Sequence, residues 1–323
     1  MRMAVEGMGV VSAGGNSPLA LAQNAQLALR GERRSTLASK ADTTALAQYV
    51  PTRNLRRVDH FTRMVLLAAY SALEDAGLTS ADLGQTGIVL ATGYGPARLT
   101  FDFLDSIIDF GPEMASPQAF AHSVHNIPAA TIALMVGLRG PCFTICQLDT
   151  AFAAAALTAR TWMAENRVTR VLLGAVDEHT DLLDVNSRRI ASELLSETSG
   201  GRRDLLPGEG AVFFCLHADP AHARHGFFEE ISMSRGGTRV GADPVFFSGS
   251  ASSERRGSMD LMFDLSPAYG NIPIAMAFDA TLALLAIQGL LSPIISGNAA
   301  VQCQSRDRFG VTGSIRVTSG SRP

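Results

Sequence analysis

The chain has 323 residues, of which 46% are hydrophobic and 18% are charged. That length and apolar content suffice for one large core or two fused halves, and they exclude a disordered chain. The 27 Lys and Arg residues and the 30 Asp and Glu residues leave a formal net charge of -3. This balance gives no reason to expect a nucleic acid or an anionic membrane as the partner.

Residue types that often carry chemistry are sparse. Lys40 is the only lysine, so a mechanism that needs a buried lysine has one candidate. The four cysteines form no C-x-x-C pair and have no histidine at metal-ligand spacing; they are Cys142, Cys146, Cys215 and Cys303. The sequence therefore predicts reduced thiols in a cytoplasmic protein, with no metal and no other cofactor.

Two apolar segments are candidates for a targeting signal or a membrane span. Residues 1–11 contain Glu6 and run into a glycine turn, which is typical of a strand and not of a signal peptide. Residues 272–295 are the most membrane-like, but Asp279 and Gln288 interrupt them. We therefore expect a buried helix there rather than a membrane span.

Strands and helices alternate in the first two thirds of the chain. Residues 3–11 predict a strand, and Gly14 and Gly15 predict a turn into a helix over residues 17–29. Further helices are predicted over residues 57–76, 99–110 and 149–165, and buried strands over residues 87–93, 142–148 and 168–175. This alternation predicts an α/β protein with a parallel sheet that is buried on both faces.

The last third repeats the pattern more faintly. Strands are predicted over residues 211–216, 226–233 and 313–317, and a helix over residues 275–291. Residues 236–257 are rich in Gly, Ser and Arg without a period, which predicts an irregular loop.

Five short blocks stand out in the sequence, namely residues 7–15 (GMGVVSAGG), 57–69 (RVDHFTRMVLLAA), 72–78 (ALEDAGL), 137–141 (GLRGP) and 207–211 (PGEGA). In this order, they together resemble the beta-ketoacyl synthase branch of the thiolase superfamily. The resemblance runs from residue 1 to about residue 217 and implies a thiolase-like αβαβα layered fold. It divides the chain into an N-terminal half, residues 1–217, and a shortened C-terminal half, residues 218–323.

The resemblance also implies where the catalytic groups of that family would lie. Ketosynthases place a cysteine on a strained turn before a helix, and here that position is Asp149. Two histidines and a lysine complete the family's machinery, and the alignment places Ser248, Gly270 and Leu265 at those positions. No histidine follows His225 in the sequence. We therefore expect no catalytic residues and read Asp149, Ser248 and Gly270 as degenerate positions.

Each of these residues also has a plainer interpretation. Asp149 at a predicted helix start is typical of an N-cap. Cys146 is a candidate displaced nucleophile, but its strand position favours a buried, inert thiol. His122 and His125 are more typical of a loop or an interface than of a metal pair. The segment HSVHN over residues 122–126 also resembles ketosynthase-like subunits of aryl polyene pathways.

A retained fold with lost chemistry resembles a chain-length factor, the inactive half of a heterodimer with an active ketosynthase. Such a subunit would shape the acyl tunnel and set the length of a polyketide or polyene, and an acyl carrier protein would act mainly through the partner. The resemblance places the length gate on the predicted helix 99–110, where we expect Thr100, Phe103, Leu104 and Ile107 to contribute. The alternatives are a divergent acyltransferase or condensing enzyme acting on acyl carrier protein thioesters, and a stand-alone acyl-binding or scaffolding protein.

Overall fold

The structure is a computed structural model that describes residues 1–32, 40–186, 189, 207–235, 245–248, 261–291 and 300–319. Of the predicted irregular loop 236–257, residues 245–248 fall within these ranges, and the rest lies outside the described residues. No single described helix combines the length and apolar character that crossing a membrane requires. One pair of shorter helices, bent by 85° at its break, meets those limits when taken together.

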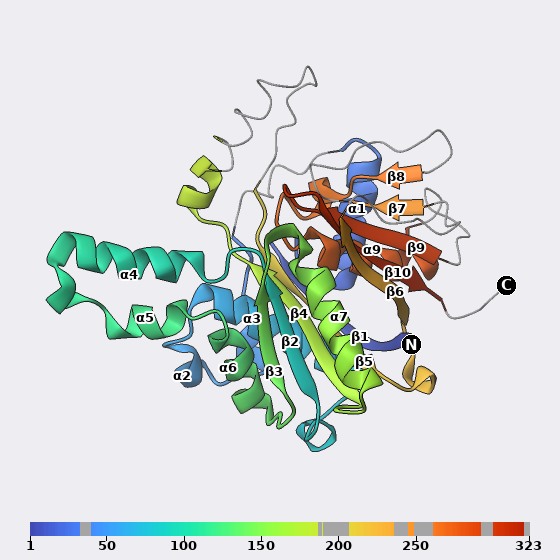
Figure 1. The fold of residues 1–323 in the computed structure, drawn as a ribbon, viewed down its shortest axis with the longest axis horizontal. Helices are drawn as coiled ribbons and strands as arrows, with labels where there is room; N and C mark the ends of the chain where they lie inside the picture. The colour runs from blue at the N-terminus through green and yellow to red at the C-terminus, as the bar shows by residue number, and fades with distance from the viewer. Residues whose placement is uncertain are drawn as a thin grey trace.

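Ten strands of the described chain form one mixed sheet (Figure 1). They are β1 (Met3–Ser12), β2 (Gly87–Thr92), β3 (Cys142–Cys146), β4 (Arg170–Asp177), β5 (Gly210–His217), β6 (Gly226–Arg235), β7 (Val245–Phe247), β8 (Leu261–Phe263), β9 (Ala300–Arg306) and β10 (Val311–Thr318). The order is β3-β2-β4-β5-β1-β6-β10-β9-β7-β8. The prediction of a parallel sheet is wrong for β5, which is antiparallel to both β4 and β1. Any strand that helices cover on both faces is a continuous apolar run, so hydrophobicity alone does not reveal its direction.

The sheet repeats one topology twice. The first half of the sheet has the order β3-β2-β4-β5-β1. Adding five to each strand number gives β8-β7-β9-β10-β6, which is the second half of the sheet read from its far end. The directions match as well, since β2 is parallel to β3 and β4 while β7 is parallel to β8 and β9. The two halves meet where β1 pairs with β6. The predicted division near residue 217 falls between β5 and β6.

Helices cover both faces of the sheet. The helices of the described chain are α1 (Pro18–Leu29), α2 (Thr52–Leu55), α3 (His60–Ala76), α4 (Ala97–Phe110), α5 (Pro117–Ser123), α6 (Ile127–Val136), α7 (Ala151–Ala164) and α9 (Ala275–Ile287). Residues of α3 and α6 share one buried core, and residues of α1, α7 and α9 share the other. Side chains of β4 alternate between the two cores, since Leu172 enters the first and Val171 and Leu173 enter the second. The α/β layering expected from the sequence is present.

Strand β3 departs most from its predicted environment. It lies at the end of the sheet and pairs only with β2 among the described strands. Cys142, Phe143 and Cys146 are exposed, so the prediction of a buried strand is wrong for β3. Its apolar sequence resembles that of a central strand, and only the strand order shows that one edge is open.

Helix α3 approaches β1 closely at two glycines. A Cβ atom added to Gly9 would overlap the carbonyl oxygen of Ala68 and lie 2.7 Å from the amide nitrogen of Ala72. Gly7 meets α3 in the same way one turn further along. The absence of side chains at these positions sets the distance between helix and sheet.

We expect Gly9→Ala to lower the free energy of unfolding by about 3 kcal/mol, because backbone atoms of α3 cannot move aside without repacking the core. Urea unfolding followed by circular dichroism measures the change. Gly84→Ala is the matched control, since nothing lies within 4 Å of a Cβ at Gly84. The control should be unchanged or up to about 1 kcal/mol more stable. Equal stability of the two variants would contradict the close packing.

Candidate functional site

The carboxyl ends of β2, β3 and β4 meet at one edge of the sheet and open into a pocket. The pocket encloses about 690 Å³ of space between atoms, part of it open to solvent. It is lined by Tyr94, Asp149, Asp177, Glu178, His179, Leu183, Asp184, Pro207, Gly208, Asn271, Ile272 and Pro273. Parallel strands bring their carboxyl ends together, which is why residues far apart in sequence meet there.

Asp149 lies on a strained turn between β3 and α7. Leu148, directly before it, has a φ of 41°, a left-handed conformation that costs a leucine energy. Burial raises the pKa of Asp149 to about 6, and the charge of Asp307 adds to the effect. The expected N-cap role is wrong, because Thr150 occupies the N-cap of α7 and Asp149 belongs to the preceding 3-10 turn, Leu148–Thr150.

Asp177, at the end of β4, is a fully buried carboxyl that receives three hydrogen bonds. The Thr92 hydroxyl donates over 2.8 Å, and the amides of Gly93 and Tyr94 donate over 2.8 and 3.0 Å. Burial raises the pKa of Asp177 to about 7 although these donors oppose the rise, and the charge of Asp149 adds to it. Asp177 thereby fixes the turn that leads from β2 into α4.

Glu178 and Glu209 fix the neighbouring elements. Glu178 accepts a hydrogen bond from the amide of Arg98 in the first turn of α4, and burial raises its pKa to about 7. Burial would also raise the pKa of Glu209, but the His60 ring, 2.8 Å away, and two backbone amides outweigh it and lower that pKa. Those amides belong to Ala41 and His179.

The floor of the pocket joins the two halves of the chain. The amide of Gly208 donates to the carbonyl of Asn271 over 3.0 Å. Gly270 has a φ of 89°, and a Cβ there would lie 2.8 Å from the Gly208 amide nitrogen. Gly270 therefore packs against Gly208 without lining the pocket, whereas its neighbour Asn271 does line it.

The remaining positions inferred from the resemblance lie away from the pocket lining. Ser248 is buried, and its amide donates to the carbonyl of Phe263 over 3.1 Å. Leu265 is fully buried in the core. Asp149 is the one degenerate position whose side chain lines the pocket, while Ser248 and Leu265 do not contribute to its walls.

Cys146 is exposed on β3, so the expectation of a buried thiol is wrong. Its Sγ lies 3.4 Å from the carbonyl oxygen of Gly93, to which it donates. Partial burial and the charge of Asp177 raise the pKa of this thiol, which disfavours the nucleophilic thiolate.

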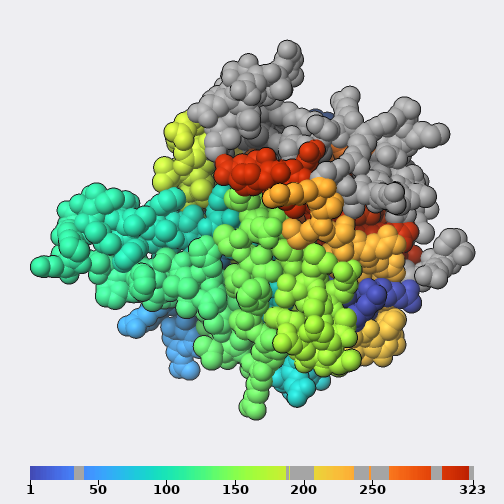
Figure 2. Space-filling view, in the orientation of Figure 1, coloured from blue at the N-terminus to red at the C-terminus, as the bar shows by residue number. Residues whose placement is uncertain are grey.

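The α4–α5 arm, residues 97–123, stands out from the body (Figures 1 and 2). Within it, the Phe103 ring packs against the Phe120 ring with 5.2 Å between centroids, and the Thr100 hydroxyl donates to the carbonyl of Pro96. Ile107 is half-buried and Leu104 is exposed. These four predicted gate residues are absent from the pocket lining.

Apolar side chains are exposed along this arm and beside it. Of the sixteen exposed large hydrophobic residues in the described chain, eight lie between residues 104 and 143. We name them the open face: Leu104, Ile108, Phe110, Met114, Phe120, Val124, Leu134 and Phe143. An apolar surface of this kind beside an unpaired strand edge is typical of a protein interface.

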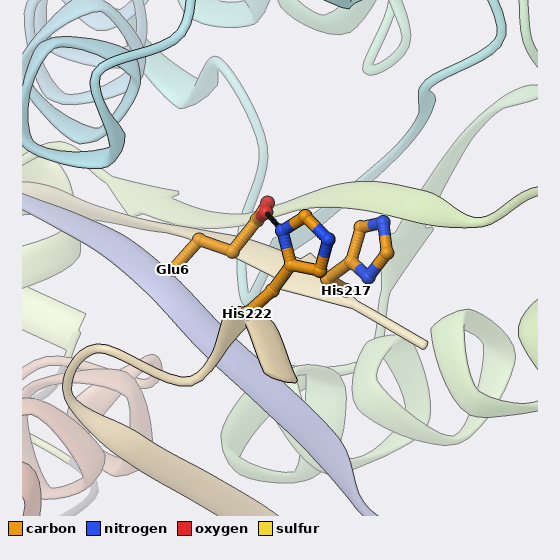
Figure 3. A group of neighbouring side chains, drawn as sticks. All are labelled: Glu6, His217 and His222. Carbon is orange, nitrogen blue, oxygen red and sulfur yellow. Dashed lines mark ion pairs between the residues drawn. The ribbon is translucent and has the colours of Figure 1, made fainter. Parts of the chain in front are cut away.

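One group of metal-ligating side chains, Glu6, His217 and His222, lies at the opposite end of β5 (Figure 3). His222 Nδ1 lies 2.8 Å from a Glu6 oxygen, and Arg170 forms two hydrogen bonds with the same carboxylate. The amide of Asp219 donates to His217 Nδ1, so the other nitrogen of the neutral ring carries the proton. These bonds engage both Glu6 oxygens and Nδ1 of both rings, and the group ties η6 (Pro220–His222) to β1 and β4.

Sequence reasoning missed Asp177, Glu178, His179, Glu209 and Asn271 as parts of this site. Asp177 is the last residue of β4, Glu178 and His179 follow it directly, and Asp149 lies three residues after the end of β3. The rule that parallel strands gather their carboxyl ends could have found Asp177, Glu178 and His179. Neither Glu209 nor Asn271 follows one of these parallel strands, so the rule does not find them. Asn271 reaches the pocket only because the second half of the chain packs against the first.

Comparison with known proteins identifies the family. Residues 21–203, more than half of the chain, match the model of the beta-ketoacyl synthase N-terminal domain. The chain belongs to this family. It is 27% identical over 155 residues to 3-oxoacyl-[acyl-carrier-protein] synthase 2 of Vibrio cholerae, covering 43% of this chain and 37% of that protein. It is 29% identical over 194 residues to a putative polyketide beta-ketoacyl synthase 1 of Streptomyces halstedii, covering 54% of this chain and 46% of that protein. The chain thus matches less than half the length of these relatives.

Solved structures confirm the thiolase-like ketosynthase fold. One is a type II polyketide synthase acyl-carrier protein in complex with its ketosynthase bound to the hexaketide, with a TM-score of 0.80, 17% identity and coverage of 98% of this chain and 99% of that chain. Another is the ishigamide ketosynthase/chain length factor, with a TM-score of 0.78, 16% identity and coverage of 99% of both chains.

Asp149 predicts a pH-dependent cost to stability. Its folded pKa of about 6 exceeds its ordinary value of 3.8, so its contribution favours folding below pH 3.8 and is lost as pH rises through 6. We expect Asp149→Asn to gain stability over the wild type as pH rises from about 4 to 7, by about 1 to 3 kcal/mol. Urea unfolding across that range measures the difference. Asp109→Asn on the exposed end of α4 controls for the substitution, and parallel curves for Asp149→Asn and wild type would refute the assignment.

Proposed function

We propose that the protein is a non-catalytic subunit of the chain-length-factor type, which pairs with an active ketosynthase and shapes the tunnel for its growing acyl chain. The observation that carries this proposal is Asp149 on the strained turn where the family resemblance expects the nucleophilic cysteine. The turn is kept, whereas the sulfur is replaced by a carboxyl.

The chemistry around Asp149 supports the loss of condensing activity. A carboxyl with a raised pKa is partly protonated near neutral pH, and it lacks the thiolate that takes up an acyl group. His179 is the only histidine among the residues that line the pocket, and its backbone amide is held by Glu209. The nearby Cys146 has a raised pKa.

The open face and the free edge of β3 support a protein partner. An edge strand with apolar side chains is a template for pairing with another chain, and exposed apolar area of this extent favours burial. The ishigamide structure, whose fold this chain shares, is described as a ketosynthase/chain length factor. We infer that an active ketosynthase binds here and that an acyl carrier protein acts mainly on that partner.

The α4–α5 arm would contribute the length gate once the partner is bound. Its side chains do not line the pocket of the single chain, so a tunnel that includes Thr100, Phe103, Leu104 and Ile107 requires walls from the partner. We propose that the product is a polyketide or polyene whose length these side chains limit. Reconstituting condensation with the cognate ketosynthase, with and without this chain, tests the function. Condensing activity of this chain alone would overturn it.

We expect Phe143→Glu to reduce binding to the cognate ketosynthase at least ~100-fold, because it places an unpaired charge in a buried apolar interface. Isothermal titration calorimetry measures the affinity. The fold should persist, because Phe143 is half exposed in the single chain. Leu19→Glu, at an exposed position of α1, is the matched control and should bind normally. Unchanged binding by Phe143→Glu would exclude β3 from the interface.

We expect Phe103→Ala to lengthen the product by roughly two carbon units if the ring closes the tunnel, because the substitution removes most of a benzyl group. Mass spectrometry of the reconstituted pair measures product length. Loss of the Phe103–Phe120 contact instead destabilises the arm if the ring is only core. Unchanged product length with poor assembly would therefore show that the length gate lies elsewhere. Phe120→Ala removes the same ring contact but leaves Phe103 in place, so it separates arm packing from gating.

A further inference from the structure

The outer side of α4 carries an acidic stripe beside the open face. Arg98, Asp102, Asp105 and Asp109 are exposed and follow one another at spacings of four, three and four residues, which places them on one side of the helix. Glu113 continues the acidic run beyond the helix. Residues 97–114 hold one arginine and four acids, a charge of +1 − 4 = −3.

That charge equals the formal net charge of the whole chain, −3, so the remaining residues sum to zero. The arm is therefore an acidic element of a chain whose remaining charges balance. Asp102 lies 3.9 Å from Arg98. Among the described residues, no cation lies within 4.0 Å of Asp105, Asp109 or Glu113.

Arg56 and Arg57 line a groove at the base of the arm together with Leu99 and Asp102. Beyond that groove, the unpaired acids alternate with exposed apolar residues: Ile108, Phe110 and Met114 are 77%, 71% and 66% exposed. The tip is thus apolar and acidic at once.

We propose that the arm docks into an apolar groove of the partner whose rim presents Arg or Lys side chains to Asp105, Asp109 and Glu113, and that these acids select a different chain over a second copy of this one. This inference rests on the proposed pairing with a ketosynthase. A second copy would bring its own arm to the interface and raise the charge there from −3 to −6. Like charges at an interface oppose association, whereas complementary charges favour the correct partner.

The test compares two triple variants that remove the same charge. The arm variant is Asp105→Asn with Asp109→Asn and Glu113→Gln. The control variant, Glu32→Gln with Glu165→Gln and Asp181→Asn, neutralises three exposed acids elsewhere. At about 0.05 M NaCl we expect the arm variant to bind the cognate ketosynthase about tenfold more weakly than the wild type, with the difference vanishing near about 0.5 M NaCl. The control variant should match the wild type.

Self-association gives an independent readout that needs no partner. In analytical ultracentrifugation at low salt, we expect the arm variant to self-associate at least ~10-fold more strongly than the wild type and the control. A tight wild-type homodimer at low salt, or equal behaviour of the two triple variants in both measurements, would overturn the proposal. If Phe143→Glu loses the ketosynthase while the arm variant keeps full affinity, the pairing stands and the acidic selection fails. If the wild type binds no ketosynthase, the proposed function fails, and the self-association experiment still decides the role of the acids.

Discussion

A buried carboxyl, Asp177, holds together the part of the structure on which function depends. Its three donors come from the turn after β2, so one side chain on β4 fixes both the wall of the pocket and the root of the α4–α5 arm. Gly93 in that turn touches Pro273 from the second half, which brings both halves to the same point. Losing any donor would leave a fully buried carboxyl short of partners, which costs more than an ordinary hydrogen bond gains.

The pocket and the open face differ in chemistry. The pocket keeps the strained turn and several buried carboxyls but offers no activated sulfur. The open face leaves apolar side chains and a strand edge in water, an unfavourable state for an isolated protein. No cysteine is among the described residues that line the pocket, and the retention of such a face beside it is the basis of the proposed function.

Local chemistry made much of the fold predictable. Helix α3 begins at the Asp59 cap and ends at Gly77, whose left-handed φ of 70° only glycine adopts freely. Buried strands β2, β4 and β5 follow their apolar runs to within two residues. Strand β9 and helix α5 were not predicted, because their mixed sequences carry no clear period. Helix α6 was not predicted, because it is apolar on nearly all sides and so shows no helical period. Helix α9 ends at Ile287, four residues earlier than predicted, because its apolar pattern continues past the last helical turn.

The sequence by itself determined most element types and the family, and it gave the expectation of aspartate in place of a cysteine, because these depend on local patterns and residue identity. Tertiary structure decided which strand lies at the edge, so Phe143 and Cys146 proved exposed although their sequence is typical of a core. It also decided that Asp177, His179 and Asn271 share a pocket with Asp149, since residues from β4 and the second half meet only after the sheet forms. Strand order and long-range packing are properties of the whole chain, and no local period encodes them.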